Sequence, residues 1–291
     1  MQARTSVRGC ADAALAFLST PAIIASMQYE IALRLIAFVS LFALFAVWEQ
    51  LAPRRSRKLP RNGRWRTNGA IVVLDTLTLR LMALVLPALA VGAAVDAGRM
   101  GWGLFNALDL PLWVELPAAV LILDFAIWAQ HWITHKVPLF WRFHRVHHAD
   151  RDMDVTTAIR FHPVEIAASM LVKVGLVYAL GPSAVAVVLF EILLNGTSLF
   201  NHANLALPPR IERGLRRVLV TPDMHRIHHS DRRCEHDSNF GFALSVWDRI
   251  FGTYRAEPAA GHDAMTVGLG WQDDRPARLG WSLWLPFRGG K

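Results

Sequence analysis

Histidine is the residue type in this sequence whose number and spacing could do chemistry. The chain has 291 residues, and 12 of them are histidines. Eight form three short boxes: His131 and His135; His144, His147 and His148; and His225, His228 and His229. Because residues at i, i+3 and i+4 share one face of a helix, each box can direct two or three imidazoles at one point.

The second and third boxes repeat more than their histidines. Residues 144–151 read HRVHHADR and residues 225–232 read HRIHHSDR. Two similar helical turns, each with three imidazoles, predict two similar half-sites and therefore two metals. Convergence and an ancient duplication explain the repeat equally well.

Imidazole nitrogen binds zinc, copper, iron and nickel. The boxes hold more ligands than one tetrahedral zinc takes, and the sequence has no HExxH, the signature of zinc proteases. His162 and His202 are two further ligand candidates, whereas we expect His236 and His262 at the surface. Metal-bound imidazoles usually donate their second N–H to an outer partner. Six aspartates near the boxes are candidates for that role, although solvation explains each one alone equally well: Asp124, Asp150, Asp152, Asp154, Asp231 and Asp237.

The elements that position these histidines are predicted to be membrane helices. The chain is 53% hydrophobic and 19% charged, against about 25% charged in soluble domains. Several apolar segments approach the ~18–20 residues that cross a bilayer. Five segments are predicted: 31–48, 70–95, 112–132, 164–180 and 183–200. Gly181-Pro182 separates the last two, which predicts a tight hairpin that either spans the membrane or re-enters it.

Charge predicts the orientation of these segments. Residues 54–66 carry seven basic residues and no acidic one directly after an apolar segment, as cytoplasmic loops do. The amino terminus is then external and all the boxes are cytoplasmic. The net charge of +8 therefore favours anionic lipid headgroups over nucleic acid as its partner. The two cysteines are far apart, which excludes a disulfide framework and a cysteine-ligated zinc site.

The predicted fold class is all-α: a polytopic membrane helical bundle with a cytoplasmic helical cap that holds a histidine-rich di-metal site. Residues 1–123 are expected to contain an amino-terminal interfacial helix (residues 1–28) and the first spans. Residues 124–256 form the histidine-box catalytic region, including the membrane hairpin 164–200. Residues 257–291 are expected to form a carboxy-terminal interfacial tail, because tryptophan and arginine are mixed there, although a solvated tail explains the mixture equally well.

Several further motifs accompany the boxes between about residue 124 and residue 255. They are RFHP at 160–163, NHAN at 201–204, TPDMHRIHHS at 221–230, NFG at 239–241 and WDRIFGTY at 247–254. With these motifs the chain resembles the fatty acid hydroxylase/sterol desaturase superfamily of membrane di-iron enzymes. The resemblance covers nearly half the chain, and it does not identify the substrate.

The resemblance implies two iron ions per chain, with zinc as a possible substitute, and an O₂-dependent hydroxylation or desaturation of a lipid C–H bond. It makes the eight box histidines the catalytic metal ligands: His131, His135, His144, His147, His148, His225, His228 and His229. His162 and His202 are extra ligands at matching positions. Electrons are expected from a separate ferredoxin- or cytochrome-type donor. Arg210, Arg213, Arg216 and Arg217 could dock that donor or contact anionic lipid.

Two other functions remain open at this point. A membrane metal-dependent hydrolase would need a general base and an open metal position, for which the sequence offers only the aspartates. A metal-binding or metal-transport protein is the other alternative. A transporter places its ligands near the middle of the membrane, whereas these boxes lie at the ends of the predicted spans.

Overall fold

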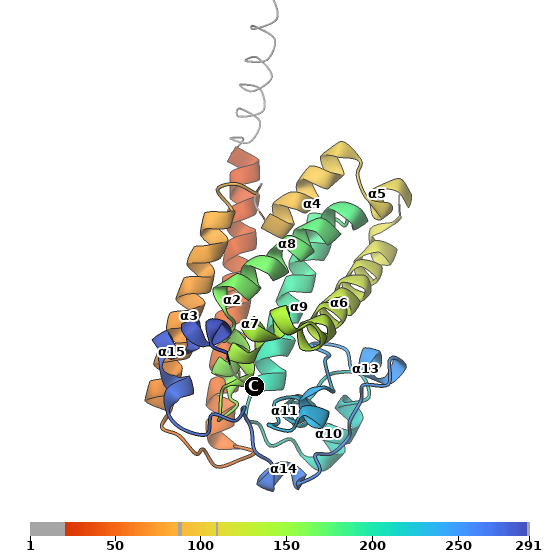
Figure 1. Cartoon of the computed structure of the whole chain (residues 1–291). Coiled ribbons are helices and arrows are strands. Elements are labelled where there is room, and N and C mark those ends of the chain that lie inside the picture. The colour runs from red at the N-terminus through yellow and green to blue at the C-terminus, as the bar shows by residue number, and fades with distance from the viewer. Residues whose placement is uncertain (1–20, 87–88, 109, 290–291) are drawn as a thin grey trace, which may run out of the picture.

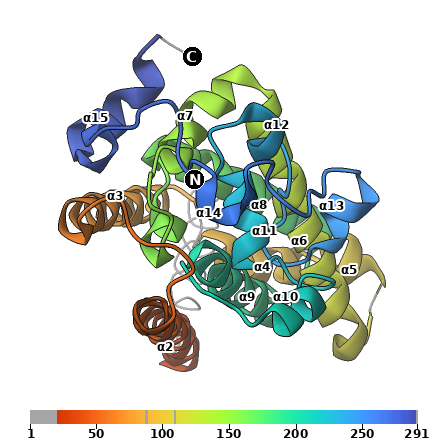
Figure 2. The ribbon, with the colours of Figure 1, turned by 90° about the horizontal axis from the view of Figure 1, so that it is seen from below.

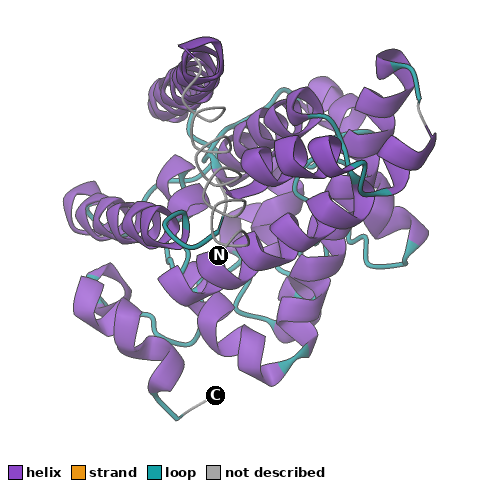
Figure 3. Cartoon of the chain, turned by 90° about the horizontal axis from the view of Figure 1, so that it is seen from above, coloured by secondary structure: helices purple, strands orange, loops and turns teal. Residues whose placement is uncertain are grey.

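The computed structural model describes residues 21–86, 89–108 and 110–289, with side chains from residue 29 onward. The described part is helical and contains no strand (Figure 3). The longer helices are α2 Pro21–Leu51, α3 Arg61–Met82, α4 Leu89–Met100, α6 Leu112–Lys136, α7 Pro138–His148, α8 Pro163–Leu180 and α9 Ala184–His202. The shorter ones are α5 Leu104–Leu108, η1 Val155–Ile159, α10 Pro209–Leu215, α11 Pro222–His228, α12 Arg233–His236, α13 Val246–Ile250, α14 Gly261–Ala264, η2 Arg275–Ala277, α15 Leu279–Trp284 and η3 Leu285–Phe287.

Four helices are long and apolar enough to cross a membrane: the 29–51 part of α2, and α6, α8 and α9. Many of their large apolar side chains are exposed, including Ile36 on α2 and Leu171 on α8. An outward apolar surface on a helix bundle is what a bilayer requires. The predicted polytopic helical bundle is confirmed, and the protein is an integral membrane protein.

The single span predicted for residues 70–95 is wrong. This stretch is divided between α3, which ends at Met82, and α4, which begins at Leu89. The sequence places Pro87 between the two helices, and a proline lacks the N–H that would continue a helix. Apolar composition alone concealed this break.

The tight hairpin predicted at Gly181-Pro182 is present. Gly181 ends α8 in the left-handed conformation with φ of 63°, and Ser183 caps α9 by accepting a hydrogen bond from the Ala186 N–H. The backbone of Gly103 packs against this turn so closely that a Cβ there would lie 2.2 Å from the Gly181 nitrogen. Glycine at both positions lets the α4–α5 connection cross over the hairpin.

Helix α9 is central to the bundle and packs against α2, α4 and α6. Its contact with α2 buries Phe45, Leu199 and Ala203, with η1 completing the cluster. Helices α6 and α9 end at the same side of the bundle, where α10 to α14 cover them (Figures 1 and 2). The short helices therefore form the predicted cap, over the span ends that carry histidines.

The carboxy-terminal segment folds back onto the bundle. Trp281 and Leu285 pack with Ile71 of α3 and Val146 of α7, while Trp284 and Phe287 are exposed. The exposed pair fits the interfacial role predicted for residues 257–291, and the buried pair fixes the segment to α3 and α7. Most of the interfacial helix predicted for residues 1–28 lies outside the described residues.

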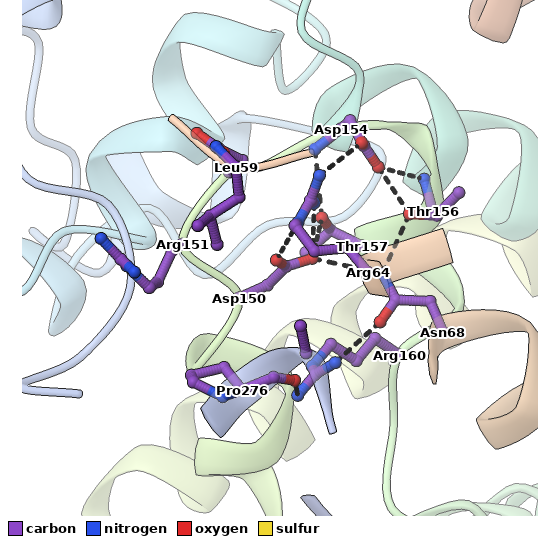
Figure 4. A network of polar contacts seen from close by, with 12 residues as sticks. Leu59, Arg64, Asn68, Asp150, Arg151, Asp154, Thr156, Thr157, Arg160 and Pro276 are labelled. Carbon is purple, nitrogen blue, oxygen red and sulfur yellow. Dashed lines mark hydrogen bonds and ion pairs between the residues drawn. The ribbon is translucent and has the colours of Figure 1, made fainter. Parts of the chain in front are cut away.

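A buried polar network joins α3 to the loop that follows α7. Arg64 donates to both oxygens of Asp150, at 2.6 and 2.8 Å, and to Asp154 at 2.7 Å (Figure 4). Asp150 also accepts from Thr157 and from the amide of Asn68. One of the seven basic residues at 54–66 is therefore an internal structural residue and not a partner of lipid headgroups.

Arg160, from the RFHP motif, extends this network. Its guanidinium is fully buried and donates to the carbonyl of Val146, to Asn68 and to the carbonyl of Pro276. Arg160 thus ties α7 and α3 to the carboxy-terminal segment. These contacts hold the residues on either side of the second histidine box in place.

Candidate metal centre

The ligand candidates converge from four helices at the capped end of the bundle. His131 and His135 lie in the last two turns of α6, and His202 is the last residue of α9. The box at 144–148 ends α7, and the box at 225–229 lies on α11 and its carboxy-terminal cap. Proline begins both α7 and α11, a position where its missing N–H costs the helix nothing.

The imidazoles form two buried groups. In each group, one ligand atom from every residue lies within 4.8 Å of all the others. We call them the five-histidine group (His131, His135, His144, His148 and His228) and the four-histidine group (His147, His202, His225 and His229). All the imidazoles are buried. Two groups of this size are what a two-metal centre needs.

Each HxxHH box contributes to both groups. His144 and His148 belong to the five-histidine group, whereas His147 between them belongs to the other. In the second box the assignment is reversed, because His225 and His229 join the four-histidine group and His228 does not. Adjacent helical residues point about 100° apart, so neighbouring histidines reach different sites. The prediction of one box for each half-site is therefore wrong, although two groups are present.

The ring nitrogens approach as ligands of a shared ion do. In the five-histidine group, Nε2 of His144 lies 3.1 Å from Nε2 of His131 and 3.2 Å from Nε2 of His148. In the four-histidine group, Nε2 of His202 lies 3.1 Å from Nε2 of His147 and 3.0 Å from Nε2 of His225. Two imidazoles on one metal, each at about 2.0–2.1 Å, place their nitrogens roughly 3 Å apart.

Seven buried ring nitrogens of the two groups have no hydrogen-bond partner. They are both nitrogens of His135 and His229, Nδ1 of His148 and His225, and Nε2 of His228. Leaving so many buried polar atoms unpaired is costly unless something else binds them. A set of imidazole donors with free nitrogens fits transition-metal ions such as iron or zinc.

Burial also sets the protonation state of these rings. Burial, followed by repulsion from the neighbouring rings, lowers the pKa of five imidazoles well below the ordinary value: His147, His148, His225, His228 and His229. The rings are therefore neutral at physiological pH. Neutral imidazole is the form that binds metal.

Backbone carbonyls orient most of the histidines that have an outer partner. Nδ1 of His131 lies 2.7 Å from the carbonyl of Phe240, Nδ1 of His202 lies 2.7 Å from that of Ser198, and Nδ1 of His228 lies 2.8 Å from that of Ser238. An Nδ1–H donated to a carbonyl leaves Nε2 free for a metal. Sequence reasoning missed these partners because every residue has a carbonyl.

One carboxylate takes the same role, and sequence reasoning missed it too. Glu165 on α8 lies 2.6 Å from Nδ1 of His144. It is the third residue after His162, in the first turn of α8. The motif RFHPVE places a carboxylate at the start of a helix that packs near the α7 box. This carboxylate could have been predicted as an outer partner from the sequence.

Most of the predicted aspartate partners have other roles. Asp124 accepts from the Trp247 indole, and Asp152 accepts from two backbone N–H groups of the 54–66 loop. Asp150 and Asp154 bind Arg64. The outer-partner prediction is wrong for these four. Asp237 lies 3.5 Å from Nδ1 of His135 without forming a hydrogen bond, so its role as an outer partner stays a prediction.

The chain matches a family model at this point. Residues 116–253 match the model described as Fatty acid hydroxylase. In this range, which is just under half of the chain, the protein is similar to the fatty acid hydroxylase family. The matched range contains every residue of both histidine groups.

Several proteins that are similar to this chain are named for lipids. It is 34% identical to alkylglycerol monooxygenase of Homo sapiens over 140 residues, which are 48% of this chain and 30% of that protein. It is 23% identical to ornithine lipid hydroxylase OlsE of Rhizobium tropici over 225 residues, 77% of this chain and 67% of that protein. It is 28% identical to a cholesterol 25-hydroxylase-like protein of Danio rerio over 150 residues, 49% of this chain and 56% of that protein. The chain spans about a third of the length of the first two alkylglycerol monooxygenases it matches. No solved structure matches it.

Three histidines of the chain lie outside both groups. His162 caps α8, because its Nδ1 accepts from the Val164 N–H, and its Nε2 lies 3.2 Å from the carbonyl of Leu283. The structure thus does not bring this ligand candidate to the centre. His236 and His262 are both buried, so the prediction of a surface position is wrong for each. His236 stacks on Trp141 beside the five-histidine group, and His262 lies near Asp223.

A cavity of about 320 Å³ leads from the membrane helices to the histidine centre. His131 and His144 line it at the centre, and α2, α3, α6, α8 and α9 form its walls. Phe161, which stacks on His147, and Phe242 border it as well. A substrate in this cavity would contact the five-histidine group first.

Proposed function

We propose that this protein is an O₂-dependent di-iron oxygenase that hydroxylates a C–H bond of a membrane lipid. The observation that carries the proposal is the pair of buried histidine groups, one of which opens into a cavity between membrane helices. Relatives named monooxygenase and hydroxylase favour hydroxylation over desaturation. The named lipids differ, so the substrate is proposed only as a membrane lipid.

We propose all members of the two groups as ligands of two iron ions, one in each group. When bound, the iron ions supply the reduction of O₂ and the cleavage of the C–H bond. The protein's residues do the rest. Carbonyl acceptors on Nδ1 hold the rings of His131, His202 and His228 in one orientation. The cavity walls position the substrate, and the cap keeps bulk water from the centre.

The fit of the residues argues against the alternatives. A metallo-hydrolase needs a general base beside an open metal position, and the carboxylate nearest the centre, Glu165, is bonded to His144. A transporter needs ligands near the middle of the membrane, whereas these groups lie at the ends of α6 and α9.

The proposal is tested with lipids and isotopic oxygen. Membranes with the intact protein, an electron donor and ¹⁸O₂ should yield a lipid that gains one labelled oxygen atom. The control is the His228→Ala variant in the same membranes. A lipid that loses two hydrogens without gaining oxygen would indicate desaturation. If no lipid changed in membranes that contain the folded protein and a working electron donor, the oxygenase proposal would be contradicted.

We propose a cytoplasmic position for the centre. Support comes from the basic 54–66 loop, which meets the cap at the same end of the bundle, where Arg54 binds Asp263 at 2.6 Å. Reporter fusions at Arg61 should read cytoplasmic and fusions near Asn106 external. External signal at Arg61 would reverse the orientation.

We propose that a separate acidic electron donor, of the ferredoxin or cytochrome type, docks on the cap. Arg210, Arg213 and Arg217 are exposed on and beside α10, whereas Arg216 pairs with Glu212 at 2.7 Å. Electrostatic steering weakens as salt rises. Changing Arg213 and Arg217 to glutamate should therefore slow donor-dependent turnover at low salt without loss of metal. Unchanged turnover would indicate that these arginines contact anionic lipid and that the donor docks elsewhere.

A further inference from the structure

The cavity that reaches the centre is lined by many polar side chains. Among them are Gln130, Thr134, Asn195 and Ser198, and five charged residues join them: Arg34, Asp75, Glu165, Lys173 and Glu191. A volume of about 320 Å³ holds on the order of ten water molecules at about 30 Å³ each. Gln130, Thr134 and three of the charged residues have partners within the protein. An alkyl chain that filled the cavity would leave unsatisfied those lining groups that have no such partner. These unpaired groups favour a lipid with a polar part at their position.

Three of the charged residues satisfy one another. Glu191 on α9 binds Arg34 at 2.7 Å and Lys173 at 2.8 Å, and Arg34 also binds Glu30. Charged groups inside a membrane pair in this way unless a ligand uses them. This cluster closes one side of the cavity with its charges already compensated.

Asp75 on α3 differs from them. Its side chain is buried, with only 6% exposed, it lines the cavity, and its Oδ1 has no hydrogen-bond partner. On the same buried stripe of α3, Arg64 and Asn68 are bonded within the network of Figure 4. Asp75 therefore presents a free acceptor to whatever occupies the cavity.

Glu165 places a second free acceptor beside the first. Its Oε1 binds Nδ1 of His144, its Oε2 has no partner, and it lines the same cavity. Burial, and after it repulsion from Glu165, raises the pKa of Asp75 to about 8, so a cationic donor that binds here would also favour the charged form of Asp75. Both free oxygens thus lie on the cavity wall, and that of Glu165 belongs to a carboxyl in contact with His144 of the five-histidine group.

We propose that Asp75 and the free oxygen of Glu165 bind a hydrogen-bond-donating headgroup, a hydroxyl or an ammonium, and so place the carbon next to that group at the metal centre. The proposal rests on the oxygenase function above and adds a substrate class to it. It makes the oxidised position a carbon near the polar end of the lipid, with the alkyl chain directed into the bilayer.

Three probes that share one alkyl chain and differ in the headgroup test the site. The first is an alkylglycerol with two hydroxyls, and the second is an amino alcohol with an ammonium group. The third ends in a methyl ether and has no hydrogen-bond donor. Equilibrium binding is measured on the full, metal-loaded chain in lipid nanodiscs. Wild type should bind both donor probes about tenfold or more tighter than the ether.

Asp75→Leu should remove this preference, because it removes the acceptor. Asp75→Asn keeps an acceptor oxygen but loses the charge, so it should keep most of the preference for the diol and lose that for the ammonium. The matched control is Asp96→Asn, whose carboxyl accepts from Tyr178 and does not line the cavity. It should bind all three probes as wild type does.

Each preference is a ratio of affinities within one variant, so a partly unfolded fraction cancels. Asp75→Leu should also melt no lower than wild type, since it removes an unpartnered buried carboxyl. A leucine variant that keeps the full preference for both donor probes would overturn the proposal. Binding is read without turnover, so a probe that binds selectively but gains no oxygen would contradict the oxygenase function and leave this site standing.

Discussion

The histidine centre and the Arg64 network are neighbours in the sequence and opposites in their hydrogen bonding. His148 and Asp150 stand two residues apart in the same motif, and both are buried. Each of the three nitrogens of Arg64 has a carboxylate partner. In the histidine centre, seven ring nitrogens have no hydrogen-bond partner.

The difference separates a structural site from a binding site. A buried polar network whose members are all bonded rigidifies the protein and offers nothing to a ligand. A buried cluster with many free acceptors is stable only when something binds it. The Arg64 network therefore positions the helices, and the histidine centre has the free ring nitrogens that could hold metal ions.

The largest effect is expected from a change in the histidine centre. His228→Ala removes a proposed ligand from the five-histidine group, and losing an outer partner alone typically costs 10–100-fold. Turnover should fall by more than about a hundredfold, while the protein stays in the membrane at wild-type amounts. Labelled-oxygen assays on matched membranes measure this. Activity within tenfold of wild type would remove the third box from the centre.

Arg64→Met is expected to act on stability. It leaves Asp150 and Asp154 buried without the guanidinium that binds both of them, and breaking a buried ion pair in this way costs about 3–5 kcal/mol. Chemical denaturation in detergent should show this loss, while the protein that remains folded keeps its metal. Lys58→Met, on the exposed loop nearby, is the control and should change little.

The same network makes a prediction about pH. Burial raises the pKa of Asp150, but the Arg64 guanidinium outweighs it and lowers the pKa to about 2, against about 3.9 in an unfolded chain. The stability that this pair contributes is complete above about pH 4 and is lost as pH falls towards 2. The gap in unfolding free energy between wild type and Arg64→Met should therefore narrow over that range. A constant gap would show that the pair is not electrostatic in origin.

Glu165→Gln should have a smaller effect, because it keeps the shape of the side chain that orients His144. Outer partners of metal ligands typically contribute 10–100-fold to metal affinity or activity. Iron binding should weaken within that range in a competition with a chelator. Glu115→Gln is the matched control, since Glu115 accepts from Ser183 at the opposite end of α6. Equal affinities in both variants would exclude Glu165 as an outer partner.

The sequence predicted the parts of this fold that depend on local spacing. Histidines three and four residues apart on a helix must share a region of space, so the box residues could be found without a structure. The division of each HxxHH box between two groups could not, because it depends on how α7 and α11 face each other. The same is true of the carbonyl partners, since a backbone oxygen leaves no trace in the side-chain pattern.

The errors also have physical reasons. His162 lies in a family motif, but its ring serves the start of α8. His236 and His262 stand apart from the boxes, and only the folded cap buries them. Asp75 lies in an apolar segment of the sequence, so nothing there marked it as a binding residue. Only the structure shows that its free oxygen lines the cavity.

The metal content of the folded protein tests the central claim most directly. Wild-type protein purified in detergent and checked for a single folded species should contain close to two metal ions per chain by elemental analysis. His147→Ala and His228→Ala each alter a different group, so each should lower the content to about one. Arg64→Met should keep two in its folded fraction. One ion or fewer in well-folded wild-type protein, or two in both histidine variants, would contradict the two-metal centre.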